Sequence, residues 1–108
     1  MNYTEKSVLK IGEKVLKDVG LWDDDIETPS ARFDDGKYLF KGENTWLVSF
    51  PYGADDYGTD INGKSRASMN IIIFDEDGIA FDVSYRNGRV ILDYDKENDK
   101  YSVKEQRP

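Results

Sequence analysis

The segment ASMNIIIFDEDGIAFDVSYRNGRVILDYD, from Ala67 to Asp95, decides the fold of this 108-residue chain. It predicts three successive β-strands, over residues 67–75, 79–86 and 89–95. Asp77-Gly78 marks the first turn and Asn87-Gly88 the second. An Asn-Gly pair is a strong hairpin signal because both of its positions tolerate positive φ. Two short hairpins in succession predict antiparallel pairing.

Apolar residues alternate along these strands with period two, as expected where one face is buried. In the second strand, one face carries Ile79, Phe81, Val83 and Tyr85, and the other carries Ala80, Asp82, Ser84 and Arg86. Ile91 interrupts the corresponding alternation in the third strand. An antiparallel sheet with this pattern packs its apolar face on another layer and leaves its polar face in solvent.

Upstream of this segment, residues 44–50 predict another strand, with Trp46, Val48 and Phe50 on one face. A shorter strand is expected near 38–41, and 31–33 is a candidate for one more. The charged stretch 96–108 is predicted to be a tail that frays, in which Tyr101–Val103 could add an edge strand.

The first element is predicted to be a helix over residues 4–19. Its apolar residues recur at helical spacing: Val8, Ile11, Val15, Leu16 and Val19. Thr4 suits the N-cap and Gly20 the C-terminal stop. Gly12 costs an isolated helix about 1 kcal/mol relative to Ala, which suggests that the helix lies close to the sheet there. We therefore expect a single α+β domain, 1–108, with an N-terminal helix packed on a curved antiparallel sheet of four to five strands.

The composition excludes several kinds of chemistry. With 22 Asp and Glu against 15 Lys and Arg, the net charge is −7, which repels phosphate backbones and favours a basic partner. The chain has no Cys and no His, so thiolate metal sites, disulfides and His-dependent catalysis are excluded. We expect no direct binding of nucleic acid, and a monomer or weak dimer.

The remaining motifs favour neither an enzyme nor a metal protein. Neither Asn62-Gly63 nor Asp77-Gly78 places oxygen ligands where a calcium loop needs them. The loop Gly53–Gly58 is acidic and lacks the Lys of a phosphate-binding loop. Paired carboxylates are present but fall in loops that look solvated. We therefore predict no catalytic residue, no cofactor and no metal.

The N-terminus is polar, and the longest apolar run is Ile71–Phe74. No secretory signal core and no membrane span is predicted, so a cytoplasmic location is expected unless a leader has been removed.

Two loops carry the predicted partner-binding residues. The loop 51–60 is long and combines tyrosines with acids, which suits a binding surface because Tyr gives rigid contact area. The second loop is an acidic run at 23–27. The predicted contact residues are Tyr52, Asp55, Asp56, Tyr57, Asp60, Asp23, Asp24 and Asp25.

The whole pattern resembles the cystatin-like and nuclear-transport-factor-like immunity proteins of bacterial toxin systems, such as contact-dependent growth inhibition. The resemblance rests on the opening helix VLKIGEKVL (8–16), the tryptophan strand TWLVSF (45–50), the Gly-rich loop after it, and NGRVI (87–91). It implies a protein that binds and neutralises a cognate toxin, often a nuclease. Two alternatives stay open: an acidic DNA mimic or other phage- or plasmid-encoded inhibitor, and a small-molecule-binding domain or enzyme.

Overall fold

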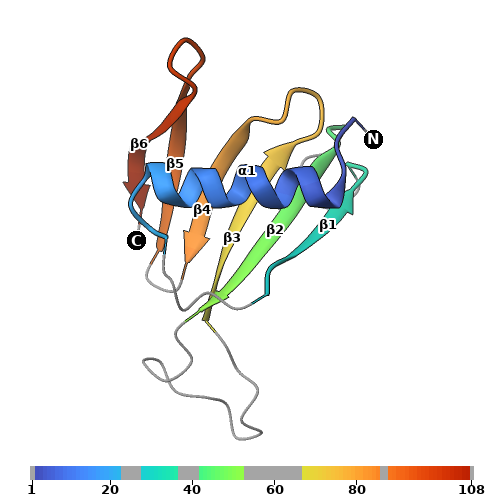
Figure 1. Cartoon of the computed structure of the whole chain (residues 1–108), viewed down its shortest axis with the longest axis horizontal. Coiled ribbons are helices and arrows are strands. Elements are labelled where there is room, and N and C mark those ends of the chain that lie inside the picture. The colour runs from blue at the N-terminus through green and yellow to red at the C-terminus, as the bar shows by residue number, and fades with distance from the viewer. Residues whose placement is uncertain (1, 23–27, 37–41, 53–66, 86–87, 108) are drawn as a thin grey trace, which may run out of the picture.

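The computed structural model describes residues 2–22, 28–36, 42–52, 67–85 and 88–107. Within them, one helix lies across a sheet of six strands (Figure 1). The elements are α1 (Glu5–Asp18), β1 (Ser30–Asp34), β2 (Thr45–Tyr52), β3 (Ala67–Phe74), β4 (Ala80–Tyr85), β5 (Gly88–Asp95) and β6 (Lys100–Arg107).

The six strands are hydrogen-bonded in chain order, and every neighbouring pair is antiparallel. The predicted class, one N-terminal helix on an antiparallel sheet, is confirmed. The predicted strand number of four to five is wrong, because 30–34 forms β1 and the expected tail forms the eight-residue β6. The strand expected near 38–41 lies outside the described residues.

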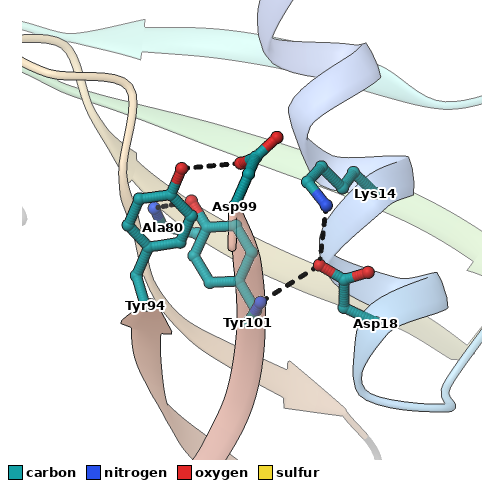
Figure 2. A network of polar contacts seen from close by, with 6 residues as sticks. All are labelled: Lys14, Asp18, Ala80, Tyr94, Asp99 and Tyr101. Carbon is teal, nitrogen blue, oxygen red and sulfur yellow. Dashed lines mark hydrogen bonds and ion pairs between the residues drawn. The ribbon is translucent and has the colours of Figure 1, made fainter. Parts of the chain in front are cut away.

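β6 forms a strand despite its charge because it lies at an edge of the sheet, where charged side chains stay in solvent. Its anchor is Tyr101, which is buried and packs on Tyr94 with ring centroids 4.6 Å apart. Figure 2 shows that the backbone N–H of Tyr101 donates to Asp18 at the end of α1, at 3.1 Å, and that its hydroxyl accepts from the N–H of Ala80, at 3.0 Å. One residue thus ties the edge strand to both α1 and β4.

Asp18 completes this junction. Its carboxylate accepts from the Lys14 ammonium at 2.9 Å as well as from Tyr101 (Figure 2). Burial acts to raise the pKa of Asp18, but these two hydrogen bonds outweigh burial and hold the pKa below its ordinary value. The carboxylate therefore stays ionised where the helix ends.

α1 begins where its N-cap satisfies the free backbone groups. The Thr4 hydroxyl accepts from the N–H of Ser7, and the Ser7 hydroxyl accepts from the N–H of Thr4. The apolar face of the helix packs on the sheet, and Gly12 allows the close approach: a Cβ there would lie 2.8 Å from Cε2 of Phe50. The core between the two layers contains Val8, Val15 and Leu16 from α1 and Val48, Phe50, Ile71, Ile73, Val83 and Val90 from the sheet.

A β-bulge between β3 and β4 changes the predicted faces of β4. Ile72 pairs with Asp82, but Ile73 pairs with Ala80, so Phe81 is an extra residue in the ladder. Ala80 and Val83 both lie in the core, whereas Phe81 does not. The expected sharing of one face by Ile79, Phe81, Val83 and Tyr85 is therefore wrong, because the bulge breaks the period of two.

Among the described residues, none of the helical segments has both the length and the hydropathy that a transmembrane span requires.

Candidate functional site

Most predicted contact residues lie outside the described part of the chain: Asp23, Asp24, Asp25, Asp55, Asp56, Tyr57 and Asp60. Tyr52 is the last residue of β2, where it pairs with Ala67 at the start of β3. The structure does place the residues from which the two acidic segments depart. Trp22 immediately precedes 23–27, and its ring packs edge-on against Phe50, two residues before Tyr52, with ring centroids 6.2 Å apart. Trp22 and Tyr52, the last described residues before the two segments, therefore lie at the same end of the sheet.

Several of the described carboxylates hold the fold together. Asp75 accepts from Asn2, Tyr3 and Trp46, and Asp18 accepts from Lys14 and Tyr101. Asp95 accepts from backbone and side-chain groups of the turn between β5 and β6. Some of the acidic side chains of this protein therefore stabilise its fold and are not available as a free binding surface.

The face of the sheet turned away from α1 carries a second set of apolar side chains. Because strand neighbours in register point to the same face, the pairs Leu47–Ile72, Ile72–Asp82 and Asp82–Ile91 form one row across four strands. Phe74 and Phe81 lie beside this row with ring centroids 6.0 Å apart. We call this surface the open face, defined by Leu47, Ile72, Phe74, Phe81, Asp82 and Ile91.

The apolar residues of the open face are separate from the core. All five are half-buried, and none of them belongs to the core cluster or packs against it. In the described part of the chain, no helix or second sheet covers this face. An apolar surface of this kind, next to polar residues, is typical of a protein interaction site.

Asp82 sits in the middle of this apolar row. It is 2% exposed, and its Oδ2 lies 3.2 Å from Nε of Arg89. Its Oδ1 is buried without a hydrogen-bond partner. Burial raises the pKa of Asp82, and the positive charge of Arg89 only partly opposes this effect.

Half-satisfied buried carboxylates are costly, because desolvation of the charge is offset only where hydrogen bonds replace those of water. Unpaired buried polar groups are therefore uncommon in native structures, and they call for a reason at the site where they occur. Chemically, Oδ1 of Asp82 can accept one further hydrogen bond. The Arg89 side chain, which pairs with Oδ2, is 48% exposed.

The rim of the open face is polar and carries one positive and one negative side chain. Arg32 pairs with Leu47 at one end of the row, and Glu105 pairs with Ile91 at the other. A stripe of hydrogen-bonding side chains runs alongside, in which the Ser49 hydroxyl lies 2.7 Å from Oδ1 of Asn70. An apolar patch with a polar rim and one central charged group is the anatomy of a binding surface.

The sequence pattern does not reveal this site. Alternation along the strand predicts that Asp82 lies on the face opposite Val83, which the structure confirms, but no local pattern shows that its cross-strand neighbours are Ile72 and Ile91. The interruption of alternation at Ile91 was the one available signal, since that residue adds an apolar group to an otherwise polar face.

No group of three or more potential metal-binding side chains occurs within the described ranges. Comparison of the chain with protein-family models, with curated proteins and with solved structures finds no match.

Proposed function

We propose that this chain is a binding protein of the immunity type, which neutralises a basic toxin domain by docking it on the open face. The observation that carries the proposal is the buried, half-satisfied carboxylate of Asp82 at the centre of an apolar surface outside the core. A destabilising group such as this carboxylate is expected in a native protein mainly at positions where function requires it.

The arrangement around Asp82 fits an interface hot spot. Such spots are central and desolvated, and they are surrounded by residues that exclude water. Ile72 and Ile91 flank the carboxylate in register, and Phe74 with Phe81 adds aromatic area beside them. A partner that covers this surface would bury the apolar groups and leave Asp82 as the point of recognition.

Charge indicates the chemistry of the partner. The unpaired Oδ1 accepts hydrogen bonds, and a charged donor pairs with a carboxylate more strongly than a neutral one. The net charge of −7 attracts a basic surface and speeds its encounter. An arginine or lysine of the partner would therefore satisfy Oδ1 while displacing Arg89. The resemblance to immunity proteins, whose targets are often nucleases, supports a toxin as that basic partner.

The two acidic segments remain predicted contacts in this proposal. Asp23, Asp24 and Asp25 belong to one segment, and Asp55, Asp56, Tyr57 and Asp60 belong to the other. We expect their charges to steer the partner before docking, with Tyr52 and Tyr57 adding contact area.

The test is a binding measurement with a basic toxin domain, which the proposal expects to be encoded next to this chain's gene. The Asp82→Asn substitution removes the charge and keeps the shape, and it should weaken the affinity by about thirtyfold or more. Glu5→Gln, an equal charge change on exposed α1, is the matched control and should leave the affinity within about twofold. Protection of cells that express the toxin domain should fail with the first variant and persist with the second.

A triple substitution, Asp55→Ala, Asp56→Ala and Tyr57→Ala, separates the two surfaces. Loss of charge steering should slow association and flatten its dependence on salt, with little change in dissociation. If Asp82→Asn leaves both affinity and protection unchanged, the open face is not the interface. Turnover of a substrate by the purified chain would contradict a pure binding role.

A further inference from the structure

A groove of ≈ 260 Å³ lies on the helix side of the sheet, away from the open face. One wall is the stripe of α1 formed by Lys6, Leu9, Lys10 and Glu13, and the rest is formed by Trp22, Pro29 and Phe50. In Figure 1, α1 crosses the strands, and the end of β2 extends beyond the helix.

The floor of the groove is apolar, and its aromatic side chains are fixed by packing against the helix and against each other. Phe50 is buried beneath the helix at Gly12, and Trp22 packs edge-on against its ring. Leu9 and Pro29 are half-buried and complete the lining. Rigid aromatic groups of this kind preorganise a site, because little ordering is needed when a ligand enters.

The rim of the groove carries positive charge in a protein whose net charge is −7. Lys6 and Lys10 are four residues apart on one helix face, where like charges repel. Neither has an ion-pair partner among the described residues. Glu13 is the only acid among the lining residues, and Lys17 pairs with it at 3.2 Å while lying 5.0 Å from the centre of the Trp22 ring. The groove therefore presents uncompensated ammonium groups above an apolar floor.

We propose that this groove binds a small amphiphile with one carboxylate and an apolar body, such as a medium-chain fatty acid. The apolar body lies on Leu9, Trp22 and Phe50, and the carboxylate lies between the ammonium groups of Lys6 and Lys10. Burial of the chain provides the affinity, and the two lysines provide the preference for an anion.

The probe is octanoate, titrated into the isotopically labelled full chain and followed by NMR. The Trp22 indole and the amide of Leu9 should shift saturably. The Trp46 indole, bonded to Asp75 in the core, is an internal reference and should not move. Octanol, which keeps the tail without the charge, should bind about tenfold more weakly, and acetate, which keeps the charge without the tail, should not bind measurably.

Variants assign the binding to the groove. The double substitution Lys6→Gln and Lys10→Gln should weaken octanoate binding by about tenfold. The matched control, Lys96→Gln with Lys104→Gln, makes the same charge change at exposed positions far along the chain and should leave the affinity unchanged. Leu9→Trp fills the groove and should abolish the shifts at Trp22.

Three results would overturn the proposal: equal binding of octanol and octanoate, equal weakening by the control pair, or undiminished binding in Leu9→Trp. None of these substitutions lies on the open face, so binding of the basic domain is a separate readout. The groove could fail its test while the proposed function stands, and the reverse is equally possible.

Discussion

The indole N–H of Trp46 donates a buried hydrogen bond of 2.9 Å to Oδ1 of Asp75. The same carboxylate accepts from the backbone N–H groups of Asn2, at 2.7 Å, and Tyr3, at 3.1 Å. Tyr3 in turn covers Gly78, where a Cβ would lie 2.6 Å from the Tyr3 ring. One side chain thus fastens the segment before α1 to the turn between β3 and β4.

Replacement of Asp75 by Ala should destabilise the protein by about 3 kcal/mol, because three donors lose their acceptor and one of them is buried. Asp75→Asn should cost less, since its amide oxygen can still accept. Urea unfolding measures both, with Glu76→Gln, an exposed neighbour, as the control. Loss of less than about 0.5 kcal/mol in the Ala variant would show that the bonds contribute little.

Acid should weaken the hydrogen bonds that Asp75 accepts from Asn2, Tyr3 and Trp46. Burial acts to raise the pKa of Asp75, but the bonds from Asn2, Trp46 and Tyr3 outweigh it, so the folded pKa lies below the ordinary value of 3.8. The stabilisation is therefore present above pH 3.8 and is lost as the pH falls through the lowered pKa. The Trp46 indole proton signal should report this loss on acid titration, and Asp75→Asn should remove the transition.

Asp82 should show the opposite dependence. Its folded pKa is raised above 3.8, so its contribution is most favourable below that pH and declines as the pH rises through the raised value. Asp82→Asn should stabilise the protein at neutral pH by about 1 kcal/mol, with the gain shrinking toward pH 4. Urea unfolding at both pH values measures this. A destabilised variant at neutral pH would show that the Arg89 pair outweighs the cost of burial.

Gly12 should resist replacement despite its position inside a helix. Ala improves helix propensity by about 1 kcal/mol, but its Cβ would lie 2.8 Å from Cε2 of the buried Phe50. Overpacking typically costs about 1–3 kcal/mol, so Gly12→Ala should be neutral to destabilising by thermal unfolding. Lys10→Ala on the exposed side should not destabilise. Phe50→Leu should make the Gly12→Ala change favourable, and a failure to do so would reject the steric account.

The Tyr94 hydroxyl should lose its proton at a higher pH than an ordinary tyrosine. Its hydroxyl donates to Oδ1 of Asp99 at 2.6 Å (Figure 2), and this bond raises the pKa of Tyr94 to about 12. Its contribution to stability is therefore complete below pH 10 and is lost as the pH rises through about 12. Ultraviolet absorbance of tyrosinate measures the titration, with Tyr94→Phe identifying the transition. Asp99→Asn should return the pKa toward 10.0, and Asn tolerates the positive φ of 50° at that position.

Local sequence was sufficient for the helix, its Thr4 cap and the antiparallel strands after Ala67. Hydrophobic periodicity and turn residues involve residues that are close together in the sequence, so they can be recognised before the tertiary structure is known. The same reasoning predicts a fraying tail over 96–108, with at most a short edge strand at Tyr101–Val103, whereas β6 runs from Lys100 to Arg107. Its charged residues are compatible with a solvated tail, and they form a strand only where the edge of a neighbouring strand is available.

The candidate sites depended on contacts that no local pattern records. The bulge at Phe81 and the register that sets Asp82 between Ile72 and Ile91 join residues of three strands. The groove likewise needs the helix stripe at Lys6 and Lys10 to meet Trp22 and Phe50. The sequence by itself determined the N-terminal helix, the antiparallel strands after Ala67 and the acidity of the chain. Only the tertiary structure decided which carboxylate is buried with one oxygen left unpaired, because burial depends on side chains that are distant in sequence and adjacent in space.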